Sequence, residues 1–131
     1  MALDPLTIIA RWQAAVSAAD FDALRALSTD DVEIVSPRGK FHGHGGAQRW
    51  VRQTGIGLQT MRAFLHGKHV VVEQTARWRV GPDSTEAPEQ VIATHFTLHG
   101  DKVARAQRYE TLDAALAAAG LPPVVPAASG R

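Results

Sequence analysis

Apolar residues recur at helical spacing at the start of the chain. Ile9, Trp12 and Val16 lie three or four residues apart, which predicts an amphipathic helix with one buried face. Asp4 and Pro5 precede this pattern, where an N-cap and a first helical residue are favoured. The first helix is therefore expected to begin at Pro5.

A mixed segment follows the first helix. In chain order we expect a helix capped by Asp20, a strand at residues 32–35, a polar glycine-rich loop at residues 38–46 and a helix that ends at Gly55. The strand should stop at Ser36-Pro37, because proline has no N–H to donate to a sheet.

From residue 58 the pattern changes to the alternation that half-buried strands show. We expect strands at residues 58–66, 69–80, 90–99 and 102–110, with a loop at residues 81–88 and tight turns between the others. An alanine-rich helix at residues 112–119 and a proline-rich tail at residues 121–131, which we expect to be mobile, complete the chain.

The order of these elements indicates the α+β class, because helices precede a run of strands joined by short turns. To bury their apolar faces, the strands must form a curved antiparallel sheet wrapped around the N-terminal helices. This predicts a cone with a cavity, of the cystatin-like α+β barrel type. With 131 residues, we expect a single domain over residues 1–120 and the tail at 121–131.

Composition narrows the classes of function. Fourteen Lys and Arg stand against thirteen Asp and Glu, so no basic field is available for a nucleic-acid backbone. The absence of cysteine excludes a disulfide scaffold, thiolate catalysis and a Cys-ligated zinc site. No apolar run is long enough for a bilayer and the start is unlike a signal peptide, so we expect a cytoplasmic protein without a membrane partner.

Two stretches resemble a known superfamily. Residues 11–24 read RWQAAVSAADFDAL and are followed by Asp30-Asp31-Val32, and residues 41–47 read FHGHGGA. Together they resemble the opening and the entry to the third helix of nuclear-transport-factor-2-like proteins. The resemblance covers residues 6–110 and is nearest to the bacterial SnoaL-like group. That group includes polyketide cyclases, ketosteroid isomerases and limonene epoxide hydrolases.

The resemblance implies a curved sheet around a cavity and often a homodimer, but it leaves the activity open. At the positions of a ketosteroid isomerase's phenol, base and second acid, this chain has Trp12, Ser36 and Thr94. None of these side chains can replace a phenol or a carboxyl group in those roles. We therefore expect no ketosteroid isomerase activity.

The limonene epoxide hydrolase pattern is also changed. Gln74, Ala76 and Arg108 stand at the positions of its Arg, first Asp and second Asp. No carboxylate remains at these positions to activate water, so this reaction is not expected in that form. A scytalone dehydratase-like site fits poorly as well, because alternation separates Tyr109 from Arg108.

Strand alternation sorts the remaining side chains into two faces. The residues expected to point into the cone are Val72, Gln74, Ala76, Trp78, Ile92, Thr94, Phe96, Leu98, Ala104, Ala106, Arg108 and Glu110. From these and the first helix, the candidate ligand-binding residues are Trp12, Gln74, Trp78, Thr94, Phe96 and Arg108. The polar outer face, which includes His95, Thr97, Arg105 and Tyr109, is the expected homodimer interface.

Arg108 has two possible roles. It lies in one row with Ala104 and Ala106, so its guanidinium should sit in a mostly apolar pocket and need an anion or several acceptors. Glu110 or Glu33 is the candidate partner in an internal ion pair. The alternative is an anchor for a ligand carboxylate, enolate or carbonyl oxygen.

Histidines offer weaker candidates. His42-x-His44 lacks a third ligand nearby, so we expect no metal site. His42 remains a weak candidate general acid or base, because its loop should lie near the mouth of the cone. His66 and His69 are interpreted as solvated turn residues.

Two hypotheses follow. The first is a small-molecule-binding SnoaL-like protein that takes a small hydrophobic or aromatic molecule. It would be a candidate cofactor-independent isomerase, cyclase or hydrolase for a cyclic or aromatic, oxygen-bearing metabolite. The second is a non-catalytic ligand-binding or dimerisation module. Neither hypothesis requires a cofactor.

Overall fold

The computed structural model describes residues 4–37, 39–77, 79–80, 85–86 and 89–122. Its elements are α1 (Pro5–Ala18), α2 (Phe21–Ala26), β1 (Ser28–Ser36), β2 (Gly39–His42), α3 (Gly43–Thr54), β3 (Gly57–His66), β4 (His69–Arg77), β5 (Arg79–Val80), β6 (Thr85–Glu86), β7 (Gln90–His99), β8 (Lys102–Tyr109) and α4 (Leu112–Ala118).

The predicted helix starts are confirmed by their caps. The Asp4 carboxylate accepts hydrogen bonds from the backbone N–H groups of Leu6, at 2.9 Å, and Thr7, at 3.2 Å. Asp20 accepts from Ala23 N in the same way at the start of α2. These bonds satisfy N–H groups that have no partner inside the helix.

The segment between α2 and α3 is more regular than predicted. Strand β1 already begins at Ser28, and the expected loop at residues 38–46 contains β2 and the first turn of α3. The reason is a hairpin in which Glu33 pairs with His42 and Ser36 with Gly39. Sheet pairing satisfies the backbone of these polar residues, although their side chains carry no strand pattern.

The second half of the chain matches the predicted strands with one correction. The strand expected at residues 69–80 ends at Arg77, and Arg79–Val80 forms a separate short strand paired with Thr85–Glu86. The rest of the expected 81–88 loop lies outside the described residues. The expected mobile tail falls mostly on residues 123–131, which also lie outside them.

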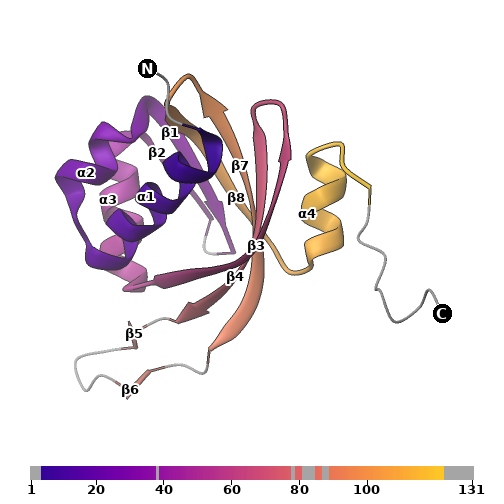
Figure 1. Cartoon of the computed structure of the whole chain (residues 1–131). Helices are drawn as coiled ribbons and strands as arrows, with labels where there is room; N and C mark the ends of the chain where they lie inside the picture. The colour runs from indigo at the N-terminus through magenta and orange to yellow at the C-terminus, as the bar shows by residue number, and fades with distance from the viewer. Residues whose placement is uncertain (1–3, 38, 78, 81–84, 87–88, 123–131) are drawn as a thin grey trace.

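Six strands form one curved sheet in the order β2-β1-β8-β7-β4-β3. All its pairs are antiparallel except β1 with β8, which are parallel. The sheet stays open, with β2 and β3 at its edges, so the α+β prediction is confirmed without a closed barrel. Helices α1, α2 and α3 lie on one side of this sheet and α4 lies on the other (Figure 1).

The main core fills the space between the inner sheet face and the first three helices. Trp12 and Phe96 are among its largest fully buried side chains, with Ile8, Val72 and Val103 around them. This core confirms the inward direction that alternation predicts for Phe96 and Val72.

One position on β8 corrects the predicted alternation. The register shifts between Thr97 and Leu98 of β7, so Leu98 pairs with Val103 and Thr97 with Arg105. Ala104, which we expected to point into the cone, is the extra residue of this bulge, and Val103 takes its place in the core.

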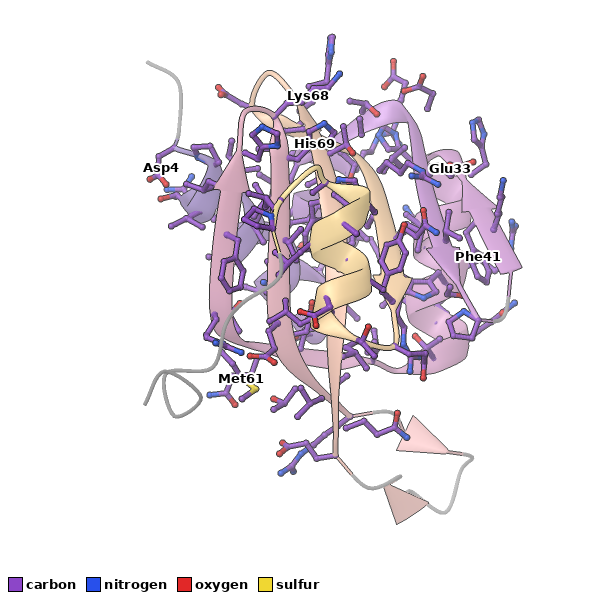
Figure 2. All side chains as sticks on the ribbon, turned by 90° about the vertical axis from the view of Figure 1, so that its right-hand side faces the viewer. Asp4, Glu33, Phe41, Met61, Lys68 and His69 are labelled. Carbon is purple, nitrogen blue, oxygen red and sulfur yellow. The ribbon has the colours of Figure 1, made fainter. Side chains whose placement is uncertain are left out.

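Helix α4 covers part of the outer sheet face, which we expected to form the homodimer interface (Figure 2). Val71 and Ala93 of the sheet form a second buried cluster with Ala115, Leu116 and Ala119. The outer face, which we expected to be polar, is therefore apolar where α4 covers it. None of the helices in the described part of the chain has the length and apolar character that a bilayer crossing requires.

Candidate functional site

A pocket of about 770 Å³ opens between the inner sheet face and helices α1 and α3. We call it the main pocket. Its described lining consists of Trp12, Ile34, Val35, Ser36, Pro37, Trp50, Thr54, Ile56, Leu58, Gln90, Ile92, Thr94, Phe96, Ala106, Arg108 and Glu110. Most of these side chains are apolar, which is typical of a small-molecule pocket.

Three aromatic rings form one wall of the main pocket. The ring of Trp12 stacks on that of Trp50, with centroids 6.0 Å apart, and meets the edge of Phe96 at 5.4 Å. The indole N–H of Trp12 donates to Ser28 Oγ at 3.0 Å, and that hydroxyl donates to Leu24 O. The polar atom of Trp12 is thus engaged, and its ring serves the pocket as an apolar surface.

Arg108 brings a positive charge to this apolar wall. It pairs across the β7–β8 ladder with Thr94, which also lines the pocket. Its Nη2 lies 3.4 Å from Glu110 Oε2, and the two side chains are 19% and 78% exposed. Of the two predicted acidic partners, Glu110 is therefore the one in contact, and it remains largely in water.

The other predicted partner is engaged elsewhere. Glu33 accepts a hydrogen bond from Arg105 Nε at 2.9 Å. The register of β1 against β8 decides this, because Arg105 pairs directly with Glu33 in this parallel ladder. Glu33 is therefore not the carboxylate that faces Arg108.

The three positions at which the resemblance places a donor, a base and an acid converge in space. Trp12, Ser36 and Thr94 all line the main pocket, although they lie on α1, β1 and β7. These three positions therefore lie at one pocket in this chain.

Gln74 lies behind the wall of the pocket. It is fully buried, and its Nε2 donates to Gln13 Oε1 at 2.8 Å, while Gln13 Nε2 donates to Thr60 Oγ1 at 2.8 Å. Helix α1 covers β4 at this point, so Gln74 is not in the described lining, whereas its ladder partner Ile92 is. The amide chain joins α1 to β4 and β3.

Trp78 and His42 are the remaining candidates. Trp78 is outside the described residues. His42 is exposed, immediately precedes α3 and is not part of the described lining. His44 Nε2 lies 3.1 Å from Ser28 O. Among the described residues, no group of three His, Cys, Asp or Glu side chains is arranged to hold a metal ion.

The structure also contains a histidine pair that the sequence analysis missed. His69 Nδ1 lies 2.9 Å from His95 Nε2 on the outer sheet face, and His95 is 5% exposed. Burial lowers the pKa of His95, and the charges of His69 and Arg105 lower it further. His66 Nδ1 contacts Ala119 O at the end of α4 at 2.8 Å, so neither turn histidine is simply solvated.

Comparison with known proteins gives one family match. Residues 9–106 match the sequence model of the SnoaL-like domain. No curated protein sequence matches the chain.

Several solved structures share the fold. A Catenulispora acidiphila protein of ketosteroid isomerase-like fold, in complex with trimethylamine, is 24% identical over 88% of this chain and 93% of its own, with a TM-score of 0.69. TerC co-crystallised with polyporic acid is 20% identical over 83% and 92%, with a TM-score of 0.69. An LEH-like epoxide hydrolase of M. tuberculosis is 17% identical over 81% of both chains, with a TM-score of 0.69.

Proposed function

Because the chain belongs to the SnoaL-like domain family, we propose that its main pocket binds a small ring compound with an anionic or carbonyl oxygen. The ring lies against the aromatic wall, and the oxygen faces Arg108. The observation that carries this proposal is a guanidinium in an otherwise mostly apolar pocket.

The shape of the pocket supports a ligand of this class. Its volume of about 770 Å³ lies in the range typical of sites for drug-sized molecules. Trp50 and Ile92 retain some exposed apolar surface in the lining, and the fully buried rings of Trp12 and Phe96 back this wall. A planar apolar ring buries its surface here without leaving polar atoms unpaired.

Charge supports the position of the oxygen. The Arg108 side chain is mostly shielded from water, so a hydrogen bond from it to a ligand oxygen is stronger than one on the surface. Glu110 competes weakly for the guanidinium, because it is largely solvated. Thr94 adds a hydroxyl beside Arg108, which orients the same oxygen.

Binding of 2-naphthoate, measured by isothermal titration calorimetry, tests this function. We expect Arg108→Gln to weaken binding about tenfold or more, because one charge-assisted hydrogen bond is lost. Neutral 2-methylnaphthalene should bind wild type and variant alike. Arg62→Gln is the matched control, since Arg62 is exposed, pairs with Glu73 and does not line the pocket. Equal loss in both variants, or no binding, would contradict the proposal.

Catalysis is a second candidate function, supported by one specific observation. Among the described lining residues, the carboxylate is Glu110, and it is held beside Arg108. If a ketone oxygen binds Arg108, Glu110 can accept a proton from the carbon next to the carbonyl, while the guanidinium stabilises the enolate.

Exchange of the α-protons of 2-tetralone in D₂O, followed by NMR, tests this second candidate. Catalysed exchange should disappear in Glu110→Gln, whereas the affinity for 2-tetralone should change little. Exchange at the solution rate in the wild type would leave the pocket a binding site only.

A further inference from the structure

A second pocket shares part of residues 54–58 with the main pocket. The second pocket has a volume of about 520 Å³ and is built largely from residues at the C-terminal ends of α1 and α3. Along this shared segment, Thr54 and Leu58 line the main pocket, whereas Gly55 and Gly57 line the second. Ile56 lines both pockets, and we call this residue the partition between them.

The backbone of this partition is held on both sides of Ile56. Gly55 has a φ of 55° and its N–H donates to Val51 O at 2.9 Å, which closes α3. Leu58 N donates to Ser17 Oγ at 3.0 Å, which ties β3 to α1. Gly57 also pairs with Arg77 at the start of the β3–β4 ladder, so the backbone is fixed around Ile56 and the partition opens by a turn of the Ile56 side chain.

The second pocket combines apolar walls with a cation. Val16, Val51 and Phe21 contribute apolar surface. Arg52 lies at the edge of the pocket with its guanidinium carbon 4.8 Å from the centre of the Phe21 ring. No carboxylate in the described part of the chain forms an ion pair with Arg52, so its N–H groups can bind an anion. The opposite side carries Arg77, which pairs with Glu89.

We propose that the two pockets act as one elongated site, with Ile56 as a movable partition. The ligand is a ring compound that carries a flexible apolar chain ending in a carboxylate. This inference rests on the proposed function, because the ring occupies the main pocket. The chain passes Ile56 into the second pocket, where the carboxylate binds Arg52.

The geometry favours this class of ligand over two separate small ligands. The side chain of Ile56 is 5% exposed, so moving it opens a passage through protein rather than through solvent. An apolar chain keeps that passage free of unpaired polar atoms. A terminal carboxylate is the group that an arginine fork binds best.

Binding of an ω-phenylalkanoate series, from phenylacetate to 10-phenyldecanoate, tests the inference by calorimetry. Short members should depend on Arg108, and long members should depend on Arg52. We expect Arg52→Gln to weaken the binding of long members about tenfold or more and to leave the affinity for phenylacetate unchanged. Arg49→Gln is the matched control, because Arg49 is on the same helix and also lies over a phenylalanine ring, that of Phe41.

Partition variants and NMR provide independent readouts. Ile56→Ala should strengthen long members only, because the partition no longer has to move, and Ile56→Val should act in the same direction if the alanine variant does not fold. In ¹⁵N spectra, long members should shift the amide signals of Gly55 and Gly57, whereas phenylacetate should not.

The outcomes separate the two proposals. If long members bind no better than short ones, or if Arg52→Gln and Arg49→Gln weaken them equally, the elongated site is wrong and the main pocket stands. If no member of the series binds, both proposals are wrong.

Discussion

At the scale of single residues, the environment of a charge decides its effect on stability. Arg108 is mostly buried but its partner Glu110 is largely in water. Removing one partner of a buried ion pair lowers the free energy of unfolding by several kcal/mol, because the other charge is left buried without compensation. Here the carboxylate left behind is already solvated.

We therefore expect Arg108→Ala to change the free energy of unfolding by less than about 1 kcal/mol, while the affinity for 2-naphthoate falls. Urea unfolding of wild type and variant measures the first quantity, and calorimetry measures the second. A loss of about 3–5 kcal/mol would instead identify Arg108 as half of a structural ion pair.

The buried His95 makes stability depend on pH. Burial first, and then the charges of His69 and Arg105, hold the pKa of His95 below its usual value in the folded state. At a pH near and below the ordinary histidine pKa of about 6.5, the unfolded chain therefore binds more protons than the folded one. Stability is full above about pH 6.5 and decreases as the pH falls, by at most about 1.4 kcal/mol per pH unit for this group.

Urea unfolding between pH 7.5 and 5 measures this dependence. His95→Asn should unfold with a shallower pH slope than the wild type. His42→Asn is the control, because His42 is exposed, and it should keep the wild-type slope. An unchanged slope in His95→Asn would show that another group causes the dependence.

At the scale of elements, α4 shows how a short helix is held by packing. A helix of seven residues is too short to be stable alone. The Thr111 hydroxyl oxygen caps its start by accepting a hydrogen bond from Ala114 N. Leu116 is fully buried against the outer sheet face, beside Val71 and Ala93. The helix is therefore held mainly by an apolar cluster with the sheet, in which Leu116 is the largest fully buried side chain.

Leu116→Ala should lower the free energy of unfolding by about 2–5 kcal/mol, because it leaves a cavity under the helix. Leu65→Ala serves as the control. Leu65 is 47% exposed, so its truncation should lower the free energy of unfolding far less. Thermal and urea unfolding measure both. Similar losses in the two variants would mean that α4 does not pack on the sheet in solution.

At the scale of the whole molecule, the open sheet leaves apolar surface for a partner. Val91 on β7 is 55% exposed and points to the same face as Ala93, and Met61 is 53% exposed. Met61 lies near one end of the sheet and His69 near the other (Figure 2). Helix α4 covers only the centre of this face, so the expected dimer interface shifts to the surface beside it.

We expect a symmetric homodimer with twice the mass of the 14.1 kDa chain. Val91→Lys should convert it to monomer, because a charge would be buried without a partner. Leu6→Lys, on α1 at the other side of the sheet, should remain dimeric. Light scattering measures each mass, and a monomeric wild type at micromolar concentration would contradict this prediction.

The sequence by itself determined the local structure. The caps at Asp4 and Asp20 and the alternation that turns Ile92 and Phe96 inward depend only on residues a few positions away. Such signals are readable because backbone geometry is set by near neighbours. The family was also identifiable, because its motifs follow one another in a fixed order.

Only the tertiary structure decided which distant side chains meet. Two glutamates were equal candidates for Arg108, and the register of the β1–β8 ladder paired Glu33 with Arg105 instead. Gln74 points inward as predicted, yet α1 lies between it and the main pocket. The docking of α4 and the shared wall at Ile56 depend on competition between surfaces far apart in the chain. That competition is decided by the total area buried, which no local pattern contains.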